Sequence, residues 1–418
     1  MMKKSLGITF VAFVSLFAPQ VRADSVRDEL FVRWKTDLSS AQRAAFHQTV
    51  PAHSIWTSTL VRGLERVKLH DGVALESALS DYAANSDVLY VEPVQQVTRQ
   101  LRDMPAMALP LSEPSVFDSV AAPTDPMYSQ QWALNGAFGI LPLDAWKVTR
   151  GSRAIKVAII DTGISQTHPD LVGKIAPGFD FIDGTDKVGD PHGHGTHVSG
   201  IIGANTDNGV GIAGISPEIT FVPIRAVPSD GDETDAGVIE AFEFATNAGA
   251  RVANCSFGKS VSSQAVSDAI AAAGERGLLA VIAAGNDGKD INVSPTYPAS
   301  FRTPNSVVVA ATTIRGGLAF FSNYGNGAVD VAAPGSNILS AVSQGDGYAS
   351  WSGTSMAAPQ VAGVAALALA ANPSLTVAQL KNVLVTSINV VPSLAGKVTS
   401  GGTIDATKAV QAALALPR

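Results

Sequence analysis

The chain has 418 residues, of which 46% are hydrophobic and 16% charged, a composition typical of globular rather than disordered proteins. This length favours one large domain with smaller units attached to it. The formal net charge is −7 and the sequence has no basic stripe, which excludes binding to nucleic acid by neutralising its phosphates.

The first 23 residues have the pattern of a secretory signal peptide. Lys3 and Lys4 precede the apolar run 6–18, and Val21-Arg22-Ala23 offers a cleavage site. We expect cleavage after Ala23 and a secreted protein, extracellular or, if the source has an outer membrane, periplasmic. The alternative is a single membrane anchor, but a run this short does not readily cross about 30 Å of hydrocarbon. We expect no membrane span in the mature form.

Residues 24–98 read as a small α+β unit. Short runs typical of strands (29–34, 64–69 and 88–91) alternate with stretches typical of helices (39–48 and 74–84). Residues 99–124 carry Pro105, Pro110, Pro114 and Pro123 among small residues, without periodicity, and are interpreted as a linker.

Residues 125–418 alternate strands and helices and form the main domain. The apolar runs are 155–161, 219–225, 252–256, 278–284 and 307–311, and the helical stretches between and after them are 196–204, 235–249, 262–276 and 355–371. Strands that are apolar on both faces and separated by helices predict an α/β fold with a parallel sheet flanked by helices on both faces. Ligands of such sheets lie beyond the carboxyl ends of the strands, where Asp161, Gly258 and Asn286 fall.

The only cysteine, Cys255, lies in the run 252–257, which has the features of a buried strand. This favours a structural thiol over a catalytic one, and a disulfide within the chain cannot form.

Three segments carry side chains for hydrolysis. Asp161 stands where an apolar strand breaks into a turn, His194 leads into a small-residue helix, and Ser355 begins the most apolar helix. A serine hydroxyl needs a histidine to take its proton, and a buried carboxylate fixes the histidine's tautomer. The backbone N–H of Ser355, at a helix N-terminus, is a donor for the negative intermediate.

With these motifs the chain resembles the subtilisin-like serine proteases, from about Pro126 to its C-terminus. The order Asp161, His194, Ser355 is that of the family, and Ala283-Ala284-Gly285-Asn286 is similar to its oxyanion segment, with Asn286 as donor. The resemblance implies a secreted serine endopeptidase that cleaves proteins or peptides with broad specificity.

The resemblance also implies a substrate cleft. Ser256, Phe257 and Gly258 would form one wall of the main pocket, Ala284 and Gly285 another, and Tyr297 the far side, with Thr296 near the base. The family often has Met where Cys255 stands and a small residue where Lys259 stands. A substrate would bind as an added strand, and Asp287 could attract a basic side chain.

A structural Ca²⁺ ion is implied in the same way. The expected ligands are Asp170, Asn208, Gln131 and the carbonyls of Thr206, Val210 and Ile212, all of them hard oxygen donors. The alternative is a solvated turn.

Residues 24–98 resemble the inhibitory propeptides of the family, which implies a zymogen that processes itself and is inhibited by its own propeptide. The first cut would fall between about 98 and 124. The alternative for this unit is an unrelated adaptor domain. The mature enzyme is expected to be a monomer.

Four other hypotheses remain to be compared with these. The sequence Gly209-Val210-Gly211-Ile212-Ala213-Gly214 follows a helix instead of a strand, so it does not indicate a dinucleotide site. His192, His194 and His197 have the spacing of a zinc cluster, but no histidine follows position 197. A peptide-binding protein without activity would usually lack a catalytic residue. A related serine–glutamate–aspartate family is excluded by His194 and Asn286.

Overall fold

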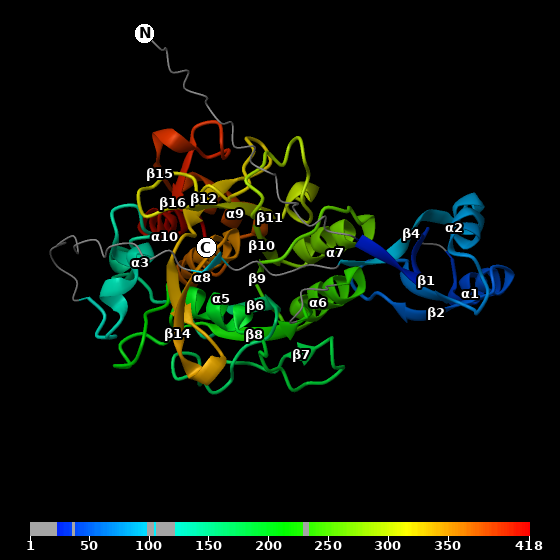
Figure 1. Ribbon diagram of the computed structural model, residues 1–418, viewed down its shortest axis with the longest axis horizontal. Coiled ribbons are helices and arrows are strands. Elements are labelled where there is room, and N and C mark those ends of the chain that lie inside the picture. The colour runs from blue at the N-terminus through cyan, green and yellow to red at the C-terminus, as the bar shows by residue number, and fades with distance from the viewer. Residues whose placement is uncertain (1–22, 36–37, 98–103, 106–121, 229–233) are drawn as a thin grey trace, which may run out of the picture.

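The computed structural model describes residues 23–35, 38–97, 104–105, 122–228 and 234–418 (Figure 1). The predicted signal peptide lies outside the described residues except for Ala23, which begins the first strand. Figure 1 shows a small N-terminal unit beside a larger, sheet-centred unit, with helices α6 (Asp235–Asn247) and α7 (Gln264–Glu275) at the junction between them.

The N-terminal unit is a four-stranded antiparallel sheet in the order β2-β3-β1-β4, packed on two helices. Its core contains Trp34, Tyr82, Leu30 and Val32. The sequence did not predict β2, because only Ala52 of this edge strand is buried and no apolar run marks it. The elements are β1 (Ala23–Trp34), α1 (Ser40–Thr49), β2 (Ala52–Thr57), β3 (Leu64–Leu69), α2 (Leu75–Ala84) and β4 (Val88–Val97).

The larger unit is built on a nine-stranded sheet in the order β15-β16-β12-β11-β10-β9-β6-β8-β7. All neighbouring strands in it are parallel except β15 and β16. The strands are β6 (Lys156–Asp161), β7 (Phe179–Asp180), β8 (Thr220–Arg225), β9 (Val252–Cys255), β10 (Leu279–Ala283), β11 (Ser306–Thr312), β12 (Val331–Pro334), β15 (Ile388–Val390) and β16 (Gly402–Ile404). A separate sheet holds β13 (Ile338–Ala341), β14 (Tyr348–Ser352) and β5 (Met104–Pro105).

Each face of the large sheet is covered by helices. Val157 and Ile159 of β6 face the cluster that includes α5 (His194–Gly203), α8 (Thr354–Ala371), α9 (Val377–Thr386) and α10 (Ala406–Leu414). Ala158 and Ile160 face the cluster that includes α6 and α7. Strands buried on both faces are why the sequence shows continuous apolar runs, and the predicted α/β fold is confirmed. Two short helices, α3 (Trp132–Asn135) and α4 (Leu143–Trp146), complete the unit.

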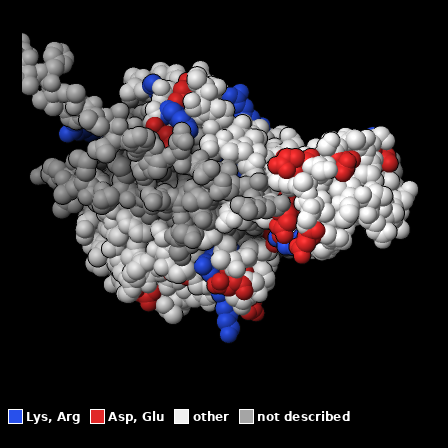
Figure 2. Space-filling model, turned by 45° about the vertical axis from the view of Figure 1, so that its right-hand side comes forward, with Lys and Arg blue, Asp and Glu red and all other residues white. Residues whose placement is uncertain are grey.

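Helix α8 is long and apolar enough to cross a membrane by composition alone, but 89% of it is buried inside the protein. It is therefore the central core helix of the large unit. On the face shown in Figure 2, Lys and Arg are scattered over the surface, and acidic and basic side chains lie together where the two units meet.

Candidate active site

Asp161 is the last residue of β6, in the interior of the sheet. The chain then turns at Gly163, whose φ is 114° and where a Cβ would overlap the carbonyl of Gly189. A Cβ on Gly195, in the first turn of α5, would overlap the carbonyl of Gly163 in the same way. Glycine at both positions lets the turn after β6 touch the start of α5, which brings Asp161 to His194.

His194 is the first residue of α5, and its Nδ1 lies 2.6 Å from Oδ1 of Asp161, with each side chain only 2% exposed. A carboxylate only accepts hydrogen bonds, so Nδ1 carries the proton and Nε2 is the basic nitrogen of the neutral ring. The main-chain N–H of Thr162 donates to the same carboxylate oxygen at 2.8 Å and fixes its position. This pair can serve as a base for a nearby hydroxyl.

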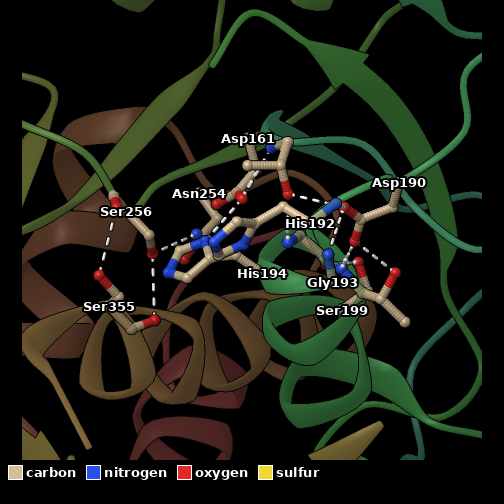
Figure 3. A network of polar contacts seen from close by, with 12 residues as sticks. Asp161, Asp190, His192, Gly193, His194, Ser199, Asn254, Ser256 and Ser355 are labelled. Carbon is tan, nitrogen blue, oxygen red and sulfur yellow. Dashed lines mark hydrogen bonds and ion pairs between the residues drawn. The ribbon is translucent and has the colours of Figure 1, made fainter. Parts of the chain in front are cut away.

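Ser355 lies in the first turn of α8, beside Ser256 just past β9. Its hydroxyl donates to the Ser256 carbonyl at 3.2 Å, and the Ser256 hydroxyl donates to the Ser355 carbonyl at 3.1 Å. The second bond follows from Pro359, four residues further along α8, which has no N–H to give that carbonyl. Figure 3 shows the ring of His194 between Asp161 and this pair of serines. The N–H of Ser355 has no acceptor within the helix and can donate to an anion.

Asn286 follows β10 and contacts the residue before the serine. Its Oδ1 accepts from the N–H of Thr354 at 2.8 Å and from the Thr354 hydroxyl at 2.9 Å. These bonds fix the amide and leave Nδ2 as a donor beside Gly353, where a Cβ would lie 3.4 Å from it. The side chain of Asn286 and the N–H of Ser355 can therefore stabilise a developing negative charge together.

Asp190 is a functional residue that sequence reasoning missed. Its Oδ1 accepts from the Thr162 hydroxyl at 2.8 Å and from the Gly193 N–H at 2.7 Å, and its Oδ2 accepts from the Thr196 N–H at 2.8 Å. It ties the turn after β6 to the N-terminus of α5, where negative charge is stabilising (Figure 3). The sequence did contain a signal for this role, because Asp190 is an acidic residue four positions before His194, close to the start of a predicted helix.

Asn323 was missed as well, and it holds the loop that carries Asn286. Its side chain is fully buried, Nδ2 donates to the Ala284 carbonyl at 2.9 Å, and Oδ1 accepts from the N–H groups of Asp287 and Lys289. Asp287, which was considered as an attractor for basic substrates, is paired with Lys289 at 3.2 Å.

The three histidines do not converge on one point. The ring of His197 stacks on Trp351, with centroids 4.6 Å apart and planes 6° apart, and its Nε2 lies 3.1 Å from the Ala349 carbonyl. Burial lowers the pKa of His197 to about 3, so it is neutral. His194 is held instead by Asp161. Within the described ranges, no group of three or more His, Cys, Asp or Glu side chains could hold a metal ion. Cys255 is fully buried, and burial raises the pKa of its thiol.

The residues expected to bind substrate lie on neighbouring loops at the carboxyl edge of the sheet. Ser256, Phe257 and Gly258 follow β9, and Ala284 and Gly285 follow β10. The backbone groups of Tyr297 and Lys259 exchange two hydrogen bonds of 2.7 Å, which closes the far side. The methyl group of Thr296 lies 3.5 Å from where a Cβ on Gly258 would stand and 3.4 Å from that of Gly285, so it lies between the two walls.

Only some of the residues expected to bind calcium contact one another. Asp170 is fully buried, its Oδ1 accepts from Nδ2 of Asn208 at 2.8 Å, and its Oδ2 accepts from the N–H of Ile212 at 3.1 Å. Gln131 does not join them, because its amide exchanges two 2.8 Å bonds with the backbone of Ala213. The hydroxyl of Thr206 accepts from the N–H of Gly214 at 3.2 Å, and Val210 is 39% exposed on the same loop.

Asp125, which the sequence did not single out, takes part in this loop. It is 3% exposed, and its carboxylate accepts from the N–H groups of Asp207 at 2.9 Å and Asn208 at 3.3 Å. Burial raises the pKa of Asp125, the two N–H bonds lower it, and the charges of Asp207 and Asp170 raise it further. In the part of the chain that the structure describes, no Lys or Arg pairs with Asp125 or Asp170.

A parallel sheet with a serine at a helix start and a histidine–aspartate pair at its carboxyl edge defines a serine hydrolase. The sequence profile of the subtilase family matches residues 152–411, and the chain belongs to this family. It is a serine endopeptidase.

Relatives match over most of the chain. Thermitase of Thermoactinomyces vulgaris is 38% identical over 291 residues, 69% of this chain and 99% of its own. The thermophilic serine proteinase of Bacillus sp. strain AK1 is 36% identical over 344 residues, 82% of this chain and 78% of its own. Fervidolysin from Fervidobacterium pennivorans, a keratinolytic enzyme related to subtilisin, superposes with a TM-score of 0.79 and 25% identity, over 96% of this chain and 62% of its own. The matches to the Bacillus proteinase and to fervidolysin are too long to lie within residues 98–418 alone and so include residues of the N-terminal unit.

Proposed function

We propose that the chain is exported as an inactive precursor, removes its own N-terminal unit, and then hydrolyses peptide bonds in proteins with broad specificity. The observation that carries this proposal is the 2.6 Å contact of His194 with Asp161 beside the hydroxyl of Ser355. A general base held by a buried carboxylate, next to a hydroxyl at a helix start, is what acyl transfer to serine requires.

In the proposed reaction, Ser355 Oγ attacks the substrate carbonyl while Nε2 of His194 takes its proton. Asp161 stays ionised, holds the ring and stabilises the imidazolium. The amide of Asn286 and the N–H of Ser355 bind the tetrahedral oxyanion. His194 then protonates the leaving amine, and water repeats the sequence on the acyl-enzyme.

Broad specificity is proposed because the cleft offers backbone rather than side-chain contacts. The segment from Ser256 to Gly258 extends from the nucleophile, and a substrate added beside it as a strand would be held mainly by main-chain hydrogen bonds. The Thr296 methyl limits the depth of the main pocket, which favours small and medium side chains before the scissile bond.

The N-terminal unit is proposed to be an inhibitory propeptide, because its contacts follow the substrate cleft. Gln96 forms an antiparallel bridge with Thr234, and Met104 and Pro105 pair with β14, which ends three residues before Ser355. The described segments on the two sides of residues 98–103 therefore each contact the larger unit. The first cut is expected between about 98 and 124, a stretch of which the structure describes only residues 104–105 and 122–124.

Export follows from the N-terminal pattern of residues 1–23, and the mature enzyme would act on proteins outside the cytoplasm as a monomer without a membrane span. An adaptor role for the N-terminal unit is disfavoured because Glu92 accepts from the hydroxyl of Ser263 at 2.6 Å and from the N–H of Gln264 at 2.9 Å, at the start of α7. A unit bound this closely to its own peptidase is suited to inhibiting it.

A calcium ion is proposed at the loop 205–212. Asp125 and Asp170 are two buried carboxylates near one another, and among the described residues no Lys or Arg side chain pairs with either of them. Asn208 lies beside both. Oxygen donors with uncompensated negative charge fit Ca²⁺, which would stabilise the loop without taking part in the reaction.

The Ser355→Ala variant tests the function. Expressed as the full chain, it should remain uncut and should not hydrolyse casein, whereas Ser294→Ala, at an exposed serine, should process itself and remain active. N-terminal sequencing of the wild-type product would locate the cut. Processing of the Ser355→Ala protein in the absence of other proteases would contradict the proposal.

A further inference from the structure

A cavity lies where the N-terminal unit meets the end of α7 (Figure 1), and none of the residues that line it belongs to the active site. Its volume is about 470 Å³, many times the roughly 30 Å³ that one water molecule occupies in the liquid. Lys35, Arg43 and Arg62 line it from the N-terminal unit, and Arg276, the residue after α7, lines it from the peptidase. The cavity can therefore hold a ligand that contacts both units.

The charge of the cavity is the opposite of that of the whole chain. Four cationic side chains line it, and none of its described lining residues is acidic. The chain as a whole has a formal net charge of −7, so its general composition does not account for this concentration of positive charge. Like charges that are held together repel one another and destabilise the folded state unless an anion lies among them.

Two carboxylates lie close to the cavity without neutralising it. Oε1 of Glu65 lies 3.4 Å from Nε of Arg43, but that Nε is buried and makes no hydrogen bond among the described residues. The carboxylate of Glu243 accepts hydrogen bonds from the hydroxyls of Ser58 and Thr59. Even when both carboxylates are counted with the four cations, the charge around the cavity remains positive.

The cations on opposite sides of the cavity keep donors for a ligand. Nζ of Lys35 donates to the carbonyl of Ser86, and Nη2 of Arg276 donates to the carbonyl of Thr59 at 2.6 Å. An ammonium and a guanidinium each carry further N–H donors, and a neutral carbonyl does not cancel their charge. Both side chains are exposed, so solvent and small ions can reach them. Donors of this kind form strong hydrogen bonds with the oxygens of sulfate and phosphate.

We propose that this cavity binds an oxyanion of the sulfate or phosphate class, and that the bound anion holds the N-terminal unit on the peptidase. Lys35 and Arg43 contact the anion from one unit and Arg276 from the other, so release of the N-terminal unit divides the site. The binding does not depend on peptidase activity. Its consequence, slower activation of the precursor when oxyanion is present, rests on the proposed function.

The physical basis is linkage between anion binding and the association of the two units. An anion that binds only while the units are joined stabilises the joined state, by about 11-fold at ten times its Kd. A sulfate ion carries two charges and four oxygens, so it can accept from both units at once. A chloride ion carries one charge and is therefore the matched control for ionic strength.

Binding is tested on the full chain with Ser355→Ala, by calorimetric titration with sodium sulfate at an ionic strength kept constant with sodium chloride. We expect saturable binding at one site. Lys35→Gln and Arg276→Gln should each raise the Kd by about 10-fold or more, as for the loss of a hydrogen bond to a charged group. Arg315→Gln, at an exposed arginine outside the cavity, should bind sulfate as the parent does.

Two variants are used because each replacement also removes a bond to a backbone carbonyl. Arg276→Gln loses its bond between the units, whereas Lys35→Gln loses a bond within the N-terminal unit. Thermal unfolding of each variant in chloride alone shows whether it is folded. If one of them is unfolded, the comparison of the other with Arg315→Gln decides the result.

The role in holding the unit is tested with the chain that keeps Ser355. The lag before the freshly folded precursor hydrolyses a chromogenic peptide should lengthen with sulfate and level off, at about 10-fold when sulfate is at ten times its Kd. Arg315→Gln should respond in the same way. In Lys35→Gln and Arg276→Gln, the same sulfate concentration should change the lag much less.

The outcomes separate the site, its role and the proposed function. Absence of saturable binding, or equal Kd values in the parent and both cavity variants, overturns the site. Sulfate binding that leaves the lag unchanged overturns the role in holding the unit. A wild-type chain that neither processes itself nor cleaves the peptide contradicts the proposed function instead, and does not alter the binding result.

Discussion

Oδ1 of Asp161 and Nδ1 of His194 lie 2.6 Å apart, and both side chains are almost completely shielded from water. The bond assigns the proton to Nδ1 and so determines which ring nitrogen can act as the base. It depends on the close approach of the turn at Gly163 to the start of α5.

Replacing Asp161 by Asn tests this relationship. An amide fits the same space but can donate to Nδ1, which favours the wrong tautomer, so kcat should fall by about 10⁴-fold with little change in KM. Steady-state kinetics on a chromogenic peptide measure the effect. Asp186→Asn removes an exposed carboxylate and should keep wild-type kinetics. A decrease of less than about tenfold in Asp161→Asn would contradict the role given to Asp161.

Asn286→Ala should lower kcat by about 10²–10³ because one of two oxyanion donors is removed. The side-chain oxygen Oδ1 of Asn286 accepts hydrogen bonds from the N–H and the hydroxyl of Thr354. Thr354→Val loses the second of these bonds and should lower kcat by a smaller factor. An increase in KM at unchanged kcat for Asn286→Ala would show that Asn286 binds substrate without stabilising the transition state.

The sequence allowed the α/β fold and the subtilase family to be predicted, because strands buried on both faces and motifs at strand ends are local features. Asp190 and Asn323 were missed because their roles depend on loops from distant parts of the chain. The same reason explains why Gln131 was expected among the calcium ligands, since its pairing with the backbone of Ala213 depends on a distant part of the chain. A carboxylate such as Asp125 is recognised only when its burial is known.

Glu92 of the N-terminal unit caps α7 of the peptidase, and its replacement should weaken the contact between the two units. A carboxylate at a helix start typically contributes about 0.5–2 kcal/mol, and Glu92→Gln loses its charge. The lag before casein hydrolysis by the freshly folded chain should therefore shorten. Glu76→Gln, at an exposed residue of α2, is the control. Equal lags in Glu92→Gln and Glu76→Gln would refute a role of Glu92 in holding the N-terminal unit on the peptidase.

Removal of calcium should lower the thermal stability of the mature enzyme. An ion bound only by the folded state contributes about 2.7 kcal/mol at 100 times its Kd, equivalent to a few degrees in Tm for a domain of this size. Calorimetry of the inhibited enzyme with and without EGTA measures the shift. Asp125→Asn and Asp170→Asn should reduce it, and an unchanged Tm in EGTA would exclude a stabilising site.

His197 should make the fold sensitive to acid. Burial holds its folded pKa at about 3, below the value near 6.5 expected in the unfolded chain. The unfolded state therefore takes up a proton that the folded state does not, so the stability contribution is complete above pH 6.5 and is lost as the pH falls toward 3. The loss is about 1.4 kcal/mol per pH unit over this window.

The effect is measured by urea unfolding between pH 8 and pH 5 in the Ser355→Ala background, which should prevent self-digestion. His197→Gln should be less stable at pH 8, because the ring stacked on Trp351 is lost. The difference between the two proteins should narrow by about 2 kcal/mol at pH 5, since only the chain with His197 has that proton to gain on unfolding. A constant difference across this range would mean that the pKa of His197 is the same in the folded and the unfolded chain, so that burial does not lower it.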